Sequence, residues 1–474
     1  MRRLALIASA LLLAACTLGP DYVRPPVDTP PDFRGATAPS SEPSLGDLGW
    51  WEVYADGTLQ GLIREALANN YDVRTAAARL LDARAQVTIA RSFQFPEVRG
   101  IASAPYQRIE GQQAPLQLRE TFAPSGGLDF GFELDFWGRF RRGTEAARAD
   151  LLATEFGRRF VITTLISDLS SAYFLLRALD VQLEIARRTL DSRTQSLELV
   201  RRREAGGVAG LIDVRQSEIL VADAAQTVPD IERQIEQTEN LISILLGRAP
   251  GPVPRGRDLG RQVAATVLPA GVPARLLEHR PDVQQAEQVL AAATARIGVA
   301  KSDYFPRVFL SGAVQAGGVM VNGQMFGPQG IFSVLPSFTL PIFNAGRVGA
   351  GVDAAYARAD EALLQYQQTI IVAFRDVSDS LVEYKKQQES RVQQEALVAA
   401  AIDTTRLANI RYSNGVSPYL EVLDSERQQF TAELGLVRVQ LSELQAVVRL
   451  YRALGGGWQG QETIAQEPSS TPKQ

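Results

Sequence analysis

Two stretches of this sequence follow one plan, and this duplication limits the folds that the chain can adopt. Residues 415–426 repeat residues 207–218 at an offset of 208, and each stretch reads as a glycine turn followed by a helix start. Ser417 is expected to be the N-cap of the later helix and Pro418 its first residue, because a proline there leaves no amide hydrogen unpaired. The fold therefore has to be built from two copies of one long unit.

Other matches extend the duplication over most of the chain. At an offset of 210, Phe95-Pro96 recurs as Phe305-Pro306, and residues 147–150 recur as residues 357–360. Matches that keep one spacing over such a distance are hard to obtain by chance. We expect a first repeat at residues 58–250, a linker at 251–272, a second repeat at 273–455 and a flexible tail at 456–474.

The first residues carry a targeting signal. Arg2 and Arg3 precede an apolar run that is too short to span a bilayer, which needs roughly 20 apolar residues. Small residues before Cys16 predict a signal peptide over residues 1–15 and lipidation of Cys16; an incidental cysteine in a plain signal peptide is the alternative. Residues 16–57, rich in proline and small polar residues up to residue 49, predict an extended tether.

Long helices with coiled-coil spacing dominate both repeats. Apolar residues recur in steps of three and four from Leu176 to Val200, and Arg193 interrupts this series. An ordinary helical bundle is the alternative to a helical barrel. The helices are expected at residues 58–92, 143–204, 210–247, 273–303, 345–412 and 418–455.

Four segments alternate instead between apolar and other residues, which is the pattern of a transmembrane β-strand. In the clearest one, apolar residues from Leu128 to Phe136 alternate with Asp129, Gly131, Glu133 and Asp135. Facing inward, these acids would weakly favour cations. The strands are expected at residues 97–105, 128–136, 308–315 and 334–342, in hairpins over 97–137 and 307–343 with polar tips near 106–126 and 317–330.

Four strands cannot close a barrel, and an open sheet edge cannot persist in lipid because its backbone groups would lack partners. If the strands cross a membrane, oligomerisation is therefore required. Half-buried strands of a soluble sheet are the alternative.

Several motifs resemble the NodT/OprM branch of the TolC-like outer membrane efflux proteins. They are residues 18–25, Trp50-Trp51, residues 136–139, residues 279–283 and residues 341–347. The resemblance implies a mainly α fold with a membrane β-barrel part, in which a homotrimer closes a 12-stranded barrel and a helical barrel. It implies a passive outer membrane exit duct for small molecules, with a periplasmic adaptor (membrane fusion protein) and an inner-membrane RND-type pump as partners. Thr17 after the cysteine points to outer membrane lipid by resemblance to Gram-negative lipoproteins.

The same resemblance assigns a periplasmic gate to the helix starts. Three copies of Leu420 would form an apolar plug, and three of Asp424 a ring of like charges. Asp213, Tyr412 and Arg427 would form links that hold the helix pair closed, whereas Ser417 replaces an arginine found in some relatives. The gate set is Asp213, Tyr412, Leu420, Glu421, Asp424 and Arg427, and the adaptor-docking tips are Gly206, Gly207, Gly415 and Val416. A solvated helix face with i to i+3 pairing is the alternative for Glu421, Asp424 and Arg427.

Catalytic chemistry has little support in this sequence. His279 is the one histidine and Cys16 the one cysteine, so we expect no metal site, no cofactor and no enzyme. A net charge of −4 gives no reason to expect a nucleic-acid partner. Two other functions stay open, namely a TolC-like duct for type I protein secretion and a lipid-anchored coiled-coil scaffold, although a scaffold would not explain the alternating strands.

Overall fold

The computed structural model describes residues 17–35, 44–108, 120–262 and 271–458. Two compact units share the chain. Unit 1 combines residues 1–26, 79–155 and 285–367, and unit 2 combines residues 27–78, 156–284 and 368–474. The signal peptide, Cys16 and most of the C-terminal tail lie outside the described residues.

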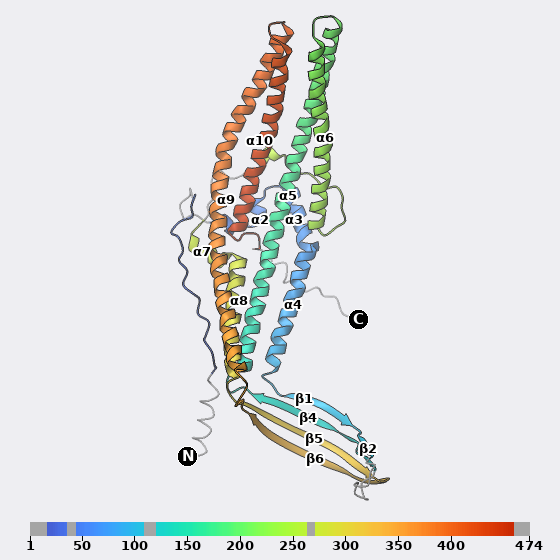
Figure 1. Ribbon diagram of the computed structural model, residues 1–474, viewed down its shortest axis with the longest axis vertical. Coiled ribbons are helices and arrows are strands. Elements are labelled where there is room, and N and C mark those ends of the chain that lie inside the picture. The colour runs from blue at the N-terminus through green and yellow to red at the C-terminus, as the bar shows by residue number, and fades with distance from the viewer. Residues whose placement is uncertain (1–16, 36–43, 109–119, 263–270, 459–474) are drawn as a thin grey trace. The chain divides into compact units, whose positions relative to one another are not determined.

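Helices of equal length recur in the two halves of the chain (Figure 1). Helices α5 and α9 each have 67 residues, α6 and α10 each have 35, and α4 and α8 each have 22. The helices are α2 (Trp50–Val53), α3 (Gly57–Asn69), α4 (Tyr71–Ser92), α5 (Arg139–Ala205), α6 (Leu211–Leu245), α7 (Pro273–His279), α8 (Pro281–Ser302), α9 (Arg347–Ser413) and α10 (Tyr419–Ala453), with the 3-10 turns η1 (Leu45–Asp47) and η2 (Leu259–Arg261).

Two helices expected to be continuous are broken, which corrects the sequence-based prediction. Asn70 separates α3 from α4, and its side chain accepts hydrogen bonds from the backbone of Asp72 and Val73 and so caps α4. Arg280 separates α7 from α8 because it precedes Pro281, and a residue before proline is disfavoured in the helical conformation.

The start of α10 also differs by one residue from the prediction. Pro418 is the N-cap, because its carbonyl accepts the bond from the Glu421 amide, and Tyr419 is the first helical residue. Ser417 is therefore one position too early to cap the helix, and its hydroxyl is buried without a hydrogen-bond partner among the residues that the structure describes.

Unit 1 contains one antiparallel sheet (Figure 1). Its four long runs lie in the order β1-β4-β5-β6, and the short β2 and β3 extend the first hairpin. The second hairpin turns at Asn322-Gly323, where both residues have positive φ, so most of the tip expected at 317–330 is strand. The strands are β1 (Glu97–Ser103), β2 (Tyr106–Arg108), β3 (Glu120–Phe122), β4 (Ser125–Leu134), β5 (Arg307–Val321) and β6 (Gln324–Thr339).

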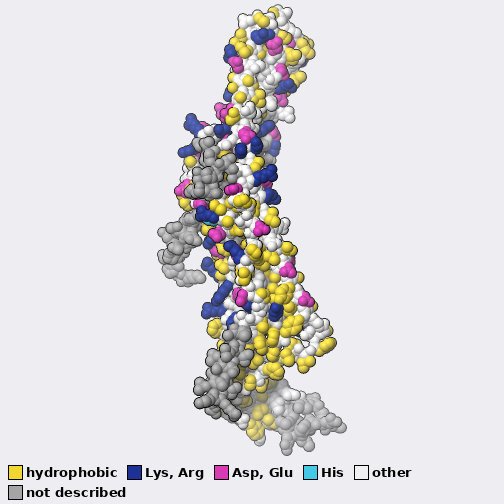
Figure 2. All heavy atoms as spheres, turned by 90° about the vertical axis from the view of Figure 1, so that its left-hand side faces the viewer, with side chains coloured by type: hydrophobic (Ala, Val, Ile, Leu, Met, Phe, Trp, Pro, Cys, Tyr) yellow, Lys and Arg dark blue, Asp and Glu magenta, His cyan; other side chains and the backbone are white. Residues whose placement is uncertain are grey.

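The strand register gives the sheet two chemically different faces. Leu128 lies opposite Val314, which lies opposite Phe332, so the apolar positions of neighbouring strands share one face. Figure 2 shows hydrophobic side chains gathered on the surface of unit 1. The alternation read from the sequence is therefore preserved by the strand pairing.

The acids of the polar face have arginine partners that the sequence pattern did not reveal. Asp129 pairs with Arg99 at 3.0 Å and Glu133 with Arg139 at 3.3 Å. Asp135, just after β4, lies 3.4 Å from Arg141. These arginines offset the negative charge of the acids. The polar face therefore gives less reason to expect a preference for cations than the acids alone suggested.

The N-terminal segment of unit 1 is extended and packs against helices. The Leu18 amide donates to the carbonyl of Trp137, and Asp21 pairs at 2.6 Å with the buried Arg142. Farther along, Arg24 pairs with Glu287. Residues 45–53, also expected as tether, form η1 and α2 in unit 2 instead, with Trp50 buried.

In unit 2, α6 runs beside α5 and α10 runs beside α9 (Figure 1). Tyr173 of α5 is buried and donates to Asp56, which also caps α3. One described helix, α5, has an apolar window that would be long enough to cross a membrane, but 61% of that window is buried inside the protein, as is typical of a core helix.

Candidate functional site

Each helix pair of unit 2 ends in a tight turn of the same design. Gly207 and Gly415 have φ of 72° and 71°, and each donates its amide three residues back. The following valines, Val208 and Val416, donate five residues back, which completes a Schellman motif in both repeats. Both valines are exposed. The turns therefore present small, apolar, geometrically matched tips.

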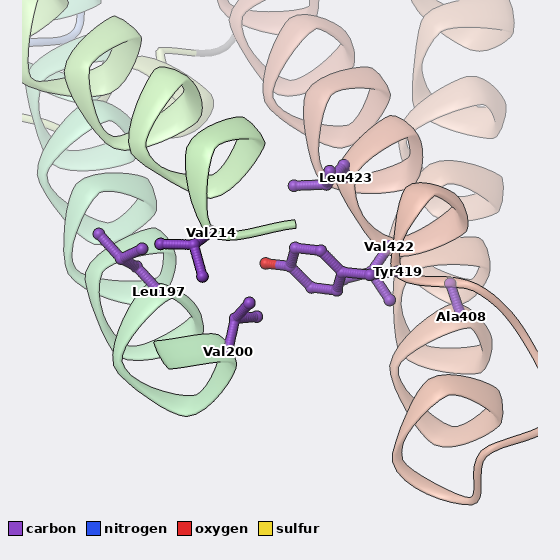
Figure 3. Packing of buried hydrophobic residues seen from close by; sticks show 7 residues of the cluster. All are labelled: Leu197, Val200, Val214, Ala408, Tyr419, Val422 and Leu423. Atoms are coloured by element: carbon purple, nitrogen blue, oxygen red, sulfur yellow. The ribbon is translucent and has the colours of Figure 1, made fainter. Parts of the chain in front are cut away.

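An apolar cluster joins the two helix pairs just behind these turns (Figure 3). Tyr419 of α10 is its largest member, and in Figure 3 its ring lies between the two pairs with the hydroxyl directed toward the start of α6. The cluster consists of Leu197, Val200, Val214, Ala408, Tyr419, Val422 and Leu423. Burial of these side chains favours a state in which the pairs stay together.

Tyr412, one of the expected gate residues, packs at the edge of this cluster. The ring centroids of Tyr412 and Tyr419 are 4.9 Å apart. The Arg203 guanidinium lies over the Tyr412 ring, 4.5 Å from its centroid. Arg203 also donates to the carbonyls of Tyr412 and Ser413. Since Arg203 belongs to α5 and Tyr412 to α9, these contacts cross from one helix pair to the other.

The other expected residues of α10 lie on its outer face. Leu420 is 60% exposed although it is apolar. Asp424 pairs with Arg427 at 2.8 Å and accepts a bond from Gln428, and Glu421 lies 3.3 Å from Arg411. Within one copy of the chain the Asp424–Arg427 contact is the i to i+3 pairing of a solvated face, whereas the Glu421–Arg411 contact joins α10 to α9.

Asp213 sits at the start of α6. Its carboxylate accepts from the Gly210 amide at 3.1 Å, a helix-capping interaction. Among the hydrogen bonds and ion pairs of the described residues, none joins Asp213 to Tyr412 or Arg427 within one copy. The Tyr412 hydroxyl is buried and has no hydrogen-bond partner in the described part of the chain.

Sequence reasoning assigned no role to Tyr419 and Glu426 and noted Arg193 only as an interruption of the apolar series. Tyr419 was read only as a helix residue, and burial raises its pKa to about 12. Burial also raises the pKa of Glu426 on the same helix, against the opposing effect of Arg193. The interruption of the apolar series at Arg193 was the only signal in the sequence for charged groups at this place.

Metal-binding chemistry finds no support near the turns. In the described parts of the chain, no group of three or more His, Cys, Asp or Glu side chains converges as metal ligands would. His279 ends the short helix α7, where its Nδ1 lies 3.5 Å from Asp47.

Comparison with known protein families identifies the family of this chain. The family described as "Outer membrane efflux protein" matches residues 62–248 and 272–456, the two repeats. The chain belongs to the outer membrane efflux protein family. The resemblance seen in the sequence is thereby confirmed, and the solved structures that this chain resembles confirm the mainly α fold with a smaller β part.

Individual relatives agree with this assignment. The toluene efflux pump outer membrane protein TtgC of Pseudomonas putida is 35% identical over 482 residues, covering 99% of each chain. The structure of the outer-membrane channel OprN matches with a TM-score of 0.86 and 33% identity over 94% of this chain and all of that one. The open state of the MtrE outer membrane channel from Neisseria gonorrhoeae matches with a TM-score of 0.84 and 32% identity, over 94% of this chain and 99% of that one.

This efflux protein is therefore an outer membrane exit duct. The scaffold alternative is wrong, because it has no place for the two-faced sheet and no support from the family. The family is one of transport ducts rather than enzymes.

Proposed function

We propose that three copies of this efflux protein close a 12-stranded β-barrel and a helical barrel, and that the duct passes small molecules delivered by an inner-membrane RND-type pump through a periplasmic adaptor. The observation that carries the proposal is the sheet of unit 1. It has an apolar and a polar face, and among the described strands of one chain β1 pairs only with β4 and β6 only with β5. Such edges need partners in lipid, which further copies supply.

The two turns are the proposed docking sites for the adaptor. Gly206-Gly207 and Gly415-Val416 form rigid Schellman motifs that expose Val208 and Val416. Paired apolar tips of equal geometry suit a helical hairpin partner. Type I protein secretion remains the second candidate for the delivered cargo, and the family's efflux relatives favour small molecules.

The gate is proposed to close on Leu420 and Asp424. Leu420 is exposed on one copy, so it is available to meet its symmetry mates as an apolar plug, and Asp424 lies one turn farther along α10. Asp213, Tyr412, Glu421 and Arg427 are the other residues proposed for the gate: Glu421 and Arg427 lie on α10 beside Leu420 and Asp424, Asp213 lies in the first turn of α6, and Tyr412 lies near the end of α9. Opening requires the second helix pair to move from the first, which separates Tyr419 from Val200 and Val214 in the cluster that joins them.

Single-channel conductance of the purified oligomer in a planar bilayer tests the duct and its gate. The wild type should show small, mostly closed currents, and the Leu420→Ala, Asp424→Ala variant large and steady ones. Ile212→Ala, Gln216→Ala is the matched control, because these residues hold the same positions in the first repeat at the offset of 208. Equal currents from variant and wild type would refute the gate, and no current from any intact oligomer would refute the open duct.

Lipidation of Cys16 is proposed as the anchor. Thr17, the next residue, lies against Gly138, which follows β4, so the lipid would begin beside the strands. Intact-mass measurement of the membrane-extracted protein should show the added acyl mass, which Cys16→Ser should abolish. An unmodified wild-type mass would refute the anchor.

A further inference from the structure

An aromatic contact joins the two halves of the duplicated chain. Among the described residues, the equivalent positions with the halves exchanged do not form such a contact. Trp137 follows β4, and its ring stacks on Phe305, which precedes β5, with centroids 4.6 Å apart and planes at 29°. Its Nε1 donates to the carbonyl of Pro306 at 2.8 Å. Because β4 and β5 are paired along their length, this aromatic clasp fastens the helix-side end of that strand pair.

Both halves of a second clasp are present in the sequence. Phe95 corresponds to Phe305 at the offset of 210. Aligning Phe132-Glu133-Leu134 with Phe338-Thr339-Leu340 places Phe343 at the position of Trp137, before the matching Gly138-Arg139 and Gly346-Arg347 pairs. Residues 344 and 345, between Phe343 and Gly346, are an insertion that has no counterpart between Trp137 and Gly138. Gly138 and Gly346 share positive φ, of 77° and 81°, which supports the correspondence.

These two residues belong to the open edges of the sheet. Phe95 precedes β1 and Phe343 follows β6, and β1 and β6 are the first and last strands in the order β1-β4-β5-β6. In the single chain Phe343 is 90% exposed and Phe95 is 56% exposed. Water-exposed aromatic rings next to unpaired strand edges are typical of an interface that awaits a partner.

A hollow adjoins Phe95 on the polar face of the sheet. It measures about 800 Å³, and its walls include Phe93, Phe140 and Phe309. At the corresponding place in the other half, Trp137 stacks on Phe305. Phe343 lies four residues beyond the end of β6 at Thr339, much as Trp137 lies three residues beyond the end of β4 at Leu134.

We infer that Phe343 of one copy stacks on Phe95 of the next copy and repeats at every junction between copies the Trp137–Phe305 clasp found inside the chain. This inference rests on the proposed ring of three copies and names the contact that closes it. Leu134 is paired with Val308 inside the chain. By the same correspondence, we expect Leu340 of one copy to pair with Val98 of the next. The tryptophan hydrogen bond is not reproduced, because phenylalanine has no donor.

Cysteine cross-linking within the oligomer tests the contact. Phe95→Cys, Phe343→Cys should give covalently linked copies with a short bifunctional thiol reagent, identified as cross-linked peptides by mass spectrometry. Trp137→Cys, Phe305→Cys calibrates the reagent on the known clasp. Val314→Cys, Phe343→Cys is the negative control, because Val314 is as exposed as Phe95 but lies on the central strand β5.

A second measurement compares two neighbouring substitutions. Phe343→Ala should make the trimer dissociate in detergent roughly tenfold faster than Ile342→Ala does, because aromatic pairs contribute beyond the area that they bury. Ile342 is 93% exposed but corresponds to Phe136, which is outside the clasp. Equal dissociation rates would overturn the inference.

The outcomes separate the inference from the proposed function. If the wild type is trimeric and the intrachain control is cross-linked, but the Phe95–Phe343 pair is not, the proposed trimer stands and the clasp is overturned. Phe343 would then face lipid. A wild type that is monomeric by mass in its membrane-extracted form would overturn both.

Discussion

The guanidinium of Arg193 lies over the ring of Phe430, 5.1 Å from its centroid, and joins α5 to α10 inside unit 2. The Arg193 side chain is only 2% exposed. Its Nη1 donates to the Leu220 carbonyl and to Asp223, whereas Nε and Nη2 have no hydrogen-bond partner among the described residues. A buried cation with unbonded N–H groups is costly, so the burial of Arg193 offsets part of the stability gained by packing the helix pairs together.

Replacing Arg193 with leucine should therefore not destabilise the helices. Leucine restores the interrupted apolar series and removes two unbonded N–H groups, and it leaves the Asp223 side chain, which is 59% exposed, in contact with water. Replacing a buried ion pair by well-packed apolar side chains is often neutral or stabilising by about 1–4 kcal/mol. Arg193→Ala is the control, and the cavity it leaves should make it about 2–5 kcal/mol less stable than the leucine variant. Thermal unfolding followed by circular dichroism measures both. A leucine variant less stable than wild type would contradict this account.

Glu426 should give the protein a pH dependence of stability. Burial raises its pKa in the folded state, with Arg193 acting in the opposite sense. Its contribution is therefore most favourable below the unfolded pKa of about 4.3 and is lost as the pH rises through the folded pKa. Ser196 and Tyr419 are the other groups that interact with it.

Unfolding of Glu426→Gln across this pH range measures the effect. The variant should lose less stability than wild type as the pH rises, because the amide cannot ionise. Glu421→Gln, on the exposed face of the same helix, should keep the wild-type profile. Parallel curves for wild type and Glu426→Gln would show that the carboxyl is solvated.

Tyr419 should hold the helix pairs together by packing rather than by its hydroxyl. Its ring is buried in the cluster of Figure 3, so Tyr419→Ala should cost about 3–5 kcal/mol and raise the open probability of the channel, whereas Tyr419→Phe should change both little. Paired unfolding and conductance measurements separate the two effects. A destabilised alanine variant that stays closed would exclude the cluster from gating.

Docking of the N-terminal segment should depend on a close crossing at Gly298. A Cβ there would lie 2.4 Å from the carbonyl oxygen of Leu18, so Gly298→Ala should push the segment away. Gly143→Ala is the control, because its Cβ would have open space and alanine favours a helix by about 1 kcal/mol. Hydrogen exchange of the peptide spanning residues 17–26 should accelerate in the first variant alone. Unchanged exchange in Gly298→Ala would contradict the packing.

Local patterns in the sequence determined much of this protein. The recurrence of Phe95-Pro96 as Phe305-Pro306 showed the duplication, and the alternation around Phe130 gave the strands and their faces, because side-chain periodicity follows directly from strand geometry. The glycine turns at Gly207 and Gly415 were recognisable because a left-handed helix end favours glycine.

Contacts between distant residues were decided only by the tertiary structure. The arginine partners of Asp129 and Glu133, the docking of Asp21 on Arg142 and the meeting of Tyr419 with Val200 and Val214 join segments with no shared local signal. The break at Asn70 depends likewise on a bond from its side chain to the carbonyl of Leu245. Local periodicity says which face of an element is buried, whereas packing chooses the neighbour that buries it.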